Sequence, residues 1–157
     1  MQWSTLLAVV IGTVVGGLST ALADHLHWRR SVVEQDRENL RKVYVEFLDA
    51  AAQTASAISD TAHDLGSPVE ARAKAARKAV NQLGLYANQF HVELSAPNPV
   101  LPLADQVIGA VLTLRNAVEE GSIPGSQPYE RAWEKIHEAR RVLREAMRDT
   151  ISRGRSG

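Results

Sequence analysis

The longest pattern of apolar positions in this chain runs from residue 31 to residue 65. Apolar residues there recur at steps of three, four or seven, which places them on one face of an α-helix. No proline or glycine interrupts the segment between Ser31 and Leu65. The sequence therefore predicts one nearly continuous helix, whose core-facing residues are Val33, Leu40, Val43, Phe47, Ala51, Ala55, Ile58, Ala62 and Leu65.

The residues after that helix carry signals for a helix end and a new helix start. Gly66 suits the left-handed C-cap, and Ser67 is a favourable N-cap. Pro68 suits the first helical position, and Glu70 completes a capping box with Ser67. Gly84 lies inside the second helix, where glycine costs about 1 kcal/mol relative to alanine, and it either allows a close helix contact or is tolerated. We expect this helix over residues 68–94, with a core face of Val69, Ala73, Ala76, Val80, Leu83, Ala87, Phe90 and Leu94.

Two further helices follow after breaks rich in proline and glycine. The third is expected to start at Pro99 with Asn98 as its N-cap, or at Pro102, and the fourth near Pro128. Their expected core faces are Leu101 or Leu103, Val107, Val111, Leu114 and Val118, and then Trp133, Ile136, Val142 or Leu143, Met147 and Ile151.

These patterns predict an all-α fold. Four amphipathic helices with short connections form an antiparallel up-down bundle, here expected over residues 31–152 with a disordered tail at residues 153–157. The alternative is a looser three-helix coil in which the third helix is unstable by itself. No strand-like alternation of apolar and polar residues is present in the sequence.

An apolar segment precedes these helices. Trp3 to Ala23 are 21 uncharged residues, and a helix needs about 20 such residues to cross the hydrocarbon core of a bilayer. Trp3 and Trp28 flank the segment, as amphipathic rings do at membrane interfaces. Ala21-Leu22-Ala23 also matches a signal-peptide cleavage site, although no Lys or Arg precedes the apolar run. The sequence favours a retained transmembrane anchor with a basic junction over residues 1–30; cleavage after Ala23 and burial in a soluble fold are the alternatives.

The basic residues around this segment predict its orientation. None precedes the apolar run, and five follow it closely: Arg29, Arg30, Arg37, Arg41 and Lys42. Because positive residues stay on the cytoplasmic side, the C-terminal side is expected there. The predicted localisation is the cell inner membrane, with a single pass, the N-terminus outside and the bundle in the cytoplasm.

Small residues inside the anchor suggest self-association. Gly12 and Gly16 form a small-xxx-small pattern that Thr20 extends by one turn. Without side chains at the glycines, two helix backbones can approach closely, so these three residues are candidates for helix dimerisation. Apolar, glycine-rich anchors also match this pattern by chance.

The charges indicate lipid rather than nucleic acid as a partner. The chain has 18 basic and 18 acidic residues, and this balance argues against nucleic-acid binding. In an up-down bundle the fourth helix returns toward the membrane. The candidates for contact with anionic lipid headgroups are therefore Arg29, Arg30, Arg140, Arg141, Arg144 and Arg148. The alternative is that the last arginines only complement the helix dipole.

No residue constellation in the sequence indicates catalysis or cofactor binding. The phosphate-binding, dinucleotide-binding, nucleophile-elbow and zinc-protease motifs are absent, and there is no cysteine. Glu134 and His137 give one Glu-x-x-His spacing, but a diiron bundle needs two copies. His25 and His27 point in different directions on a helix and chelate poorly. We therefore expect a protein that is not an enzyme and binds no cofactor or metal.

The segment "WRRSVVEQDRENLRKVYVEFLDAA", Trp28 to Ala51, resembles a group of small actinobacterial single-pass membrane proteins with a cytoplasmic helical domain. The matching positions are Arg29, Arg30, Arg41, Lys42, Tyr44, Phe47 and Leu48. The resemblance covers about the first third of the chain. It implies an anchored helical protein and assigns neither an activity nor site residues.

The sequence thus predicts a membrane-anchored helical protein that acts by binding, as a scaffold or accessory subunit with a protein partner or with itself. The alternative is a secreted helical protein released by cleavage after Ala23. A membrane-permeabilising protein of phage type and an enzyme are the remaining alternatives.

Overall fold

The computed structural model describes residues 34–153. The chain divides into two compact units, Met1–Asn39 and Leu40–Gly157. Of the first unit only residues 34–39 are described, and they are helical. The predicted anchor, its Gly12, Gly16 and Thr20, and the junction arginines lie outside the described residues. Among the residues that are described, no helix has the length and apolar character needed to cross a membrane.

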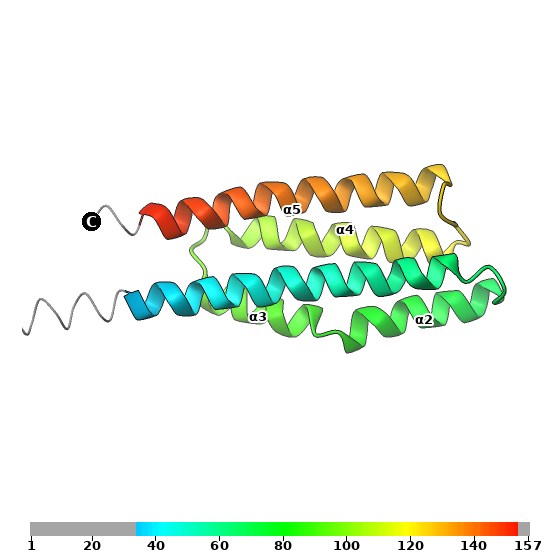
Figure 1. Cartoon of the computed structure of the whole chain (residues 1–157), viewed down its shortest axis with the longest axis horizontal. Coiled ribbons are helices and arrows are strands. Elements are labelled where there is room, and N and C mark those ends of the chain that lie inside the picture. Colours follow the sequence, from blue (N-terminus) through cyan, green and yellow to red (C-terminus); the bar gives the residue numbers. More distant parts are fainter. Residues whose placement is uncertain (1–33, 154–157) are drawn as a thin grey trace, which may run out of the picture. The chain divides into compact units, whose positions relative to one another are not determined.

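The second unit consists of helices, and no strand occurs in its described part (Figure 1). Its first helix covers residues 40–63. It is followed by α2 (Val69–Gln82), α3 (Leu85–Ser95), α4 (Leu101–Glu119) and α5 (Gln127–Arg153). The all-α prediction is confirmed for these residues.

Contacts between the helices show that they run alternately up and down. The first helix is antiparallel to α5, because Tyr44 near its start shares a hydrogen bond of 3.3 Å with Thr150, near the end of α5. Ser59, further along the first helix, shares one of 2.7 Å with Tyr129 at the start of α5. In the same way the α2–α3 segment is antiparallel to α4, because Arg77 Nη1 of α2 lies 3.0 Å from Glu119 Oε2 at the end of α4 and Gln89 Nε2 of α3 lies 2.8 Å from Asp105 Oδ1 near its start. The α2 and α3 helices together form one antiparallel segment of the bundle (Figure 1).

The predicted core faces of three of the four segments are confirmed. Phe47, Ile58, Leu114, Ile136 and Leu143 are all fully buried. They join one continuous core that draws on every helix of the unit. Val33 lies outside the described residues. Among the described members of these faces the exception is Leu65, which is 67% exposed because the first helix ends at residue 63.

The capping box predicted at the start of the second segment is wrong. The α2 helix begins at Val69 with Pro68 at the N-cap position, and no side chain caps it. Ser67 Oγ instead donates a hydrogen bond of 2.6 Å to Asp64 Oδ2 in the preceding turn. Gly66 is not among the glycines with positive φ. In a capping box the Ser67 oxygen would accept a hydrogen bond from a backbone N–H of the new helix, whereas here its hydroxyl donates to the carboxylate three residues earlier.

The single helix predicted over residues 68–94 is also wrong, because it breaks at Gly84. This glycine has a φ of 71° and separates α2 from α3. A residue in the left-handed conformation rotates the helix that follows it relative to the helix before it. In α3 the buried residues are therefore Leu85 and Val92. The predicted core residues Ala87, Phe90 and Leu94 lie on the exposed side of α3.

The last two helix starts lie close to their predicted positions. The α4 helix begins at Leu101, between the two proposed prolines, with Pro102 in its first turn. Asn98 is not its N-cap, because Val100 occupies that position without a side-chain cap. The α5 helix begins at Gln127, one residue before Pro128, and the Glu130 carboxylate accepts a hydrogen bond of 2.9 Å from the backbone N–H of Gly125.

The break at Gly84 leads to a stability prediction. Gly84→Ala should lower the free energy of unfolding by about 1–2 kcal/mol, because a Cβ disfavours the left-handed conformation. Gly109→Ala is the matched control: Gly109 lies inside α4, and a Cβ added there meets nothing within 4 Å. It should raise the free energy of unfolding by about 0.5–1 kcal/mol through helix propensity. Urea unfolding of the full chain in a mild detergent, followed by circular dichroism, measures both changes. Equal effects of the two substitutions would contradict the break at Gly84.

Candidate functional site

The α5 arginines proposed to contact lipid do not form one open basic face. Arg141 is held by two acids of its own helix: its Nη2 lies 2.6 Å from Glu138 Oε1, and its Nη1 lies 2.8 Å from Glu145 Oε1. The hydrogen bond from Arg141 lowers the pKa of the Glu138 carboxyl. The same acids raise the pKa of the arginine, so its charge is locally neutralised.

The other three arginines of this set differ in exposure. Arg140 is half-buried, and its Nε is buried without a hydrogen-bond partner. Arg144 is exposed and its Nε donates to the Arg140 carbonyl at 3.2 Å. Arg148 is exposed. Although these three arginines follow one another at steps of four residues, Arg140 lies at the edge of the core, whereas Arg144 and Arg148 lie on the surface. Arg29 and Arg30, the other two candidates, lie outside the described residues.

Hydroxyl groups connect α5 to the first helix. The Tyr129 hydroxyl shares a hydrogen bond with Ser59 across the bundle. At the other end of the bundle burial raises the pKa of the Tyr44 hydroxyl, and its hydrogen bond with Thr150 opposes this effect. These two hydrogen bonds join opposite ends of the two antiparallel helices. Within α5 itself, the Tyr129 and Trp133 rings meet edge to face with centroids 6.5 Å apart, and the Trp133 and His137 rings lie 5.5 Å apart.

A buried arginine lines a cavity near the connection between the first helix and α2. Arg72 is only 7% exposed, and its Nε and Nη1 are buried without a hydrogen-bond partner. The cavity has a volume of about 310 Å³, and Asp60 and Asp64 also line it. Neither carboxylate forms an ion pair with Arg72 in the described structure. Such an unpaired buried cation is costly, and sequence reasoning gave no signal for it because Arg72 sits among other basic residues of α2.

A shallow groove runs between α4 and α5. It has a volume of about 620 Å³, and its lining includes Gly109, Ala110, Ala139 and Val142. Glu134, Lys135 and Glu138 of α5 also line the groove, and Glu138 pairs with Arg141 of the same helix.

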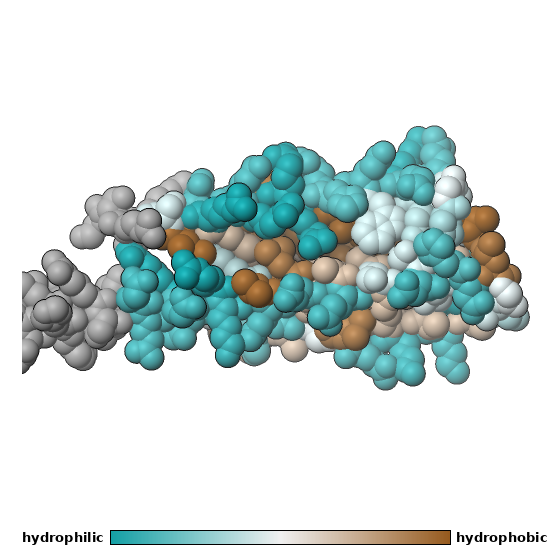
Figure 2. Space-filling model, in the orientation of Figure 1, coloured by the Kyte–Doolittle hydropathy of each residue, from teal (hydrophilic) through white to brown (hydrophobic). Residues whose placement is uncertain are grey.

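Exposed apolar residues gather at two places on the second unit. Figure 2 shows one of them at the end formed by the first helix–α2 and α4–α5 connections. There Leu65, Val69 and Ile123 are exposed, and a Cβ added at Gly121 would lie 3.7 Å from a Val69 methyl group. This contact places the two connections side by side.

The other exposed apolar group is the outer side of α3. Tyr86 is 46% exposed, Phe90 56% and Leu94 70%, and they follow one another at steps of four residues. Sequence periodicity assigned Phe90 and Leu94 to the core and missed this surface. The signal that could have revealed it is Gly84, because a glycine inside an apolar pattern can interrupt the helix that carries the pattern.

The described residues contain no group of three or more His, Cys, Asp or Glu side chains placed to hold a metal ion. Comparisons with protein-family models, curated proteins and solved structures give no match for this chain.

Proposed function

We propose that this chain is a single-pass membrane protein whose helical bundle binds a protein partner or a second copy as a scaffold or accessory subunit. The observation that carries the proposal is the run of 21 uncharged residues from Trp3 to Ala23, followed by basic residues only on its C-terminal side. The proposed topology places the N-terminus outside and the bundle in the cytoplasm. The resemblance of residues 28–51 to small actinobacterial membrane proteins points the same way.

The proposed topology gives the bundle one end that faces the bilayer. In this topology the first helix starts near the membrane. The end of α5 lies at the same end of the bundle as the start of the first helix, because Tyr44 shares a hydrogen bond with Thr150. Arg144 and Arg148 are then the α5 residues best placed to contact anionic headgroups, since both are exposed. Self-association through Gly12, Gly16 and Thr20 forms part of the same proposal.

The experiment is the intact mass of the untagged protein in fractionated cells that express it. We expect a full-length species in the membrane pellet that resists carbonate extraction. A species beginning at Asp24 in the exported soluble fraction would overturn the anchor, the glycine-mediated dimer and the lipid-facing arginines together. That outcome would instead support the secreted helical protein.

A further inference from the structure

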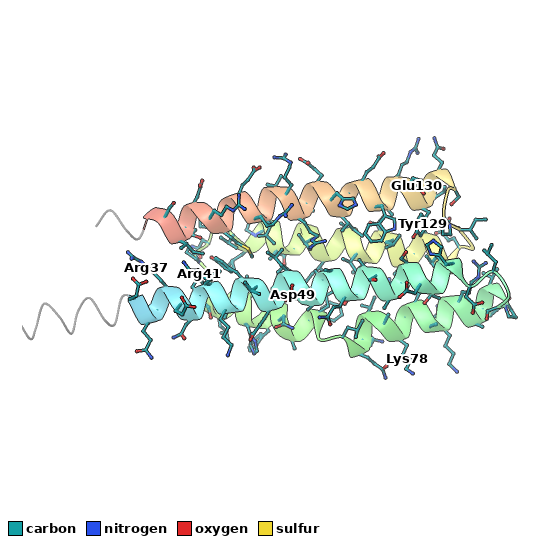
Figure 3. All side chains as sticks on the ribbon, viewed as in Figure 1. Arg37, Arg41, Asp49, Lys78, Tyr129 and Glu130 are labelled. Atoms are coloured by element: carbon teal, nitrogen blue, oxygen red, sulfur yellow. The ribbon has the colours of Figure 1, made fainter. Side chains whose placement is uncertain are left out.

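Burial distinguishes Arg72 from the other basic residues of α2. Lys74, Arg77 and Lys78 are exposed, and Figure 3 shows Lys78 pointing away from the bundle. Arg72 is 7% exposed, and its Nε and Nη1 have no hydrogen-bond partner in the described part of the chain. A buried charge without a partner destabilises a fold, and proteins retain such local conflicts mostly at functional sites. Arg72 is therefore a candidate ligand-binding residue.

The cavity beside Arg72 is large enough for a small molecule. Its volume of about 310 Å³ lies at the lower end of the range for ligand pockets and equals roughly ten water molecules at about 30 Å³ each. Asp60 of the first helix and Asp64 of the following turn line it on one side, and Arg72 lines it from α2. Both aspartates are exposed, whereas Arg72 is buried. The carboxylates therefore lie at the opening and the guanidinium at the inner wall.

The charged groups of this cavity do not neutralise one another. Neither Asp60 nor Asp64 forms an ion pair with Arg72, although all three side chains line the same space. Asp64 instead accepts the hydrogen bond from Ser67 Oγ. The α2 helix also begins here without a side-chain cap, so its N-terminus favours a negative group next to Arg72. The arrangement is complementary to a molecule that carries a negative group inward and a positive group at the opening.

Simple ions fit this arrangement less well. A phosphate or another small anion could bind Arg72, but it would face two carboxylates of its own sign. A metal ion would face the guanidinium, and the described residues hold no group of three or more His, Cys, Asp or Glu side chains placed for one. A molecule with both a carboxylate and an ammonium group avoids both repulsions and can form charge-assisted hydrogen bonds at both ends.

We propose that the cavity between the first helix and α2 binds a free amino acid. The carboxylate of the amino acid accepts hydrogen bonds from the Arg72 guanidinium, and its α-ammonium group donates to Asp60 and Asp64 at the opening. Because two carboxylates face one guanidinium, L-lysine binds more tightly than L-glutamate. This inference goes beyond the scaffold proposed above and does not depend on the anchor, since all three residues belong to the second unit.

Nuclear magnetic resonance of the full chain in mild detergent tests the proposal. Protein with isotope-labelled arginine gives a backbone signal and an Nε–H signal for Arg72, both identified by their loss in Arg72→Met. At neutral pH and constant ionic strength, L-lysine should shift these signals along a saturable curve for one site, whereas the signals of exposed Arg77 stay in place. L-Glutamate should bind at least about tenfold more weakly. Arg72 signals that do not move with L-lysine at tens of millimolar would overturn the proposal and leave a cavity filled by water.

Two analogues of lysine test its two groups separately. L-Lysinamide has no carboxylate, and α-N-acetyl-L-lysine has no α-ammonium group. Each should bind at least about tenfold more weakly than L-lysine. Equal binding of lysinamide would overturn the contact between the carboxylate and Arg72, because it would show a cation attracted only by the exposed acids. Equal binding of the acetylated compound would overturn the assignment of Asp60 and Asp64 to the α-ammonium group.

Two variants test the residues of the cavity. Arg72→Met should abolish the shifts that L-lysine causes in the backbone signals of Ala71 and Ala75, which also line the cavity, and the exposed control Arg77→Met should keep them. Urea unfolding of the same samples separates loss of the site from loss of the fold. Unchanged binding in a folded Arg72→Met variant would overturn the proposal. Energetic coupling of Arg72 to Asp60 or Asp64 without amino acid would also overturn it, because the guanidinium would then be paired already.

Discussion

Phe47→Ala is expected to lower the free energy of unfolding by about 3–5 kcal/mol. Phe47 is fully buried on the first helix and belongs to the core shared by all helices of the bundle. Truncation removes the hydrophobic transfer free energy of the ring and leaves a cavity that the rigid surroundings only partly fill. Because a domain of this size is stable by about 5–15 kcal/mol, this variant should be close to unfolding at physiological temperature.

Phe90→Ala is the matched control for this prediction. The same side chain is removed, but Phe90 is 56% exposed on the outer side of α3. Its replacement should change the free energy of unfolding by less than about 1 kcal/mol. Urea unfolding of the full chain in mild detergent, followed by far-ultraviolet circular dichroism, measures both. Similar losses for the two variants would mean that Phe90 is buried, as the periodicity of the sequence had predicted.

The second large change in the free energy of unfolding is expected on replacement of Arg72, and it is an increase rather than a decrease. Arg72→Met should raise the free energy of unfolding by about 1–3 kcal/mol. Two guanidinium nitrogens of Arg72 are buried without hydrogen-bond partners, and folding removes them from water without compensation. Methionine fills a similar volume and carries no polar group, and apolar replacement of buried charges is often stabilising.

Arg77→Met, five residues further along α2, is the control for this effect. Arg77 is exposed and pairs with Glu119 of α4, so its replacement should lower the free energy of unfolding by no more than about 1 kcal/mol. A loss of several kcal/mol in Arg72→Met would show that the guanidinium is paired in solution. Asp60 and Asp64, which line the same cavity, are then the candidate partners. A double-mutant cycle with Asp60→Asn or Asp64→Asn would identify the coupled carboxylate.

The sequence predicted the candidate surfaces less well than the fold. The arginine spacing on α5 is correct as a spacing, and the positions of Glu138 and Glu145 three and four residues from Arg141 permit the two ion pairs that hold it. Spacing alone does not decide whether such pairs form, because that depends on side-chain rotamers. Phe90 and Leu94 of the exposed row on α3 were predicted as core, since they continue the apolar periodicity of α2. Periodicity reports which residues share a face of one helix, and it cannot report a change of phase at a break.

The sequence by itself determined the helical class, the approximate starts of α4 and α5 and the buried faces of the first helix, α4 and α5. Each of these follows from local spacing, because a stripe repeated every three or four residues can be buried only on one side of a helix. Tertiary structure decided the break at Gly84 and the exposure of Phe90. These depend on where neighbouring segments lie, and a φ of 71° at one glycine is enough to redirect every side chain that follows it in α3.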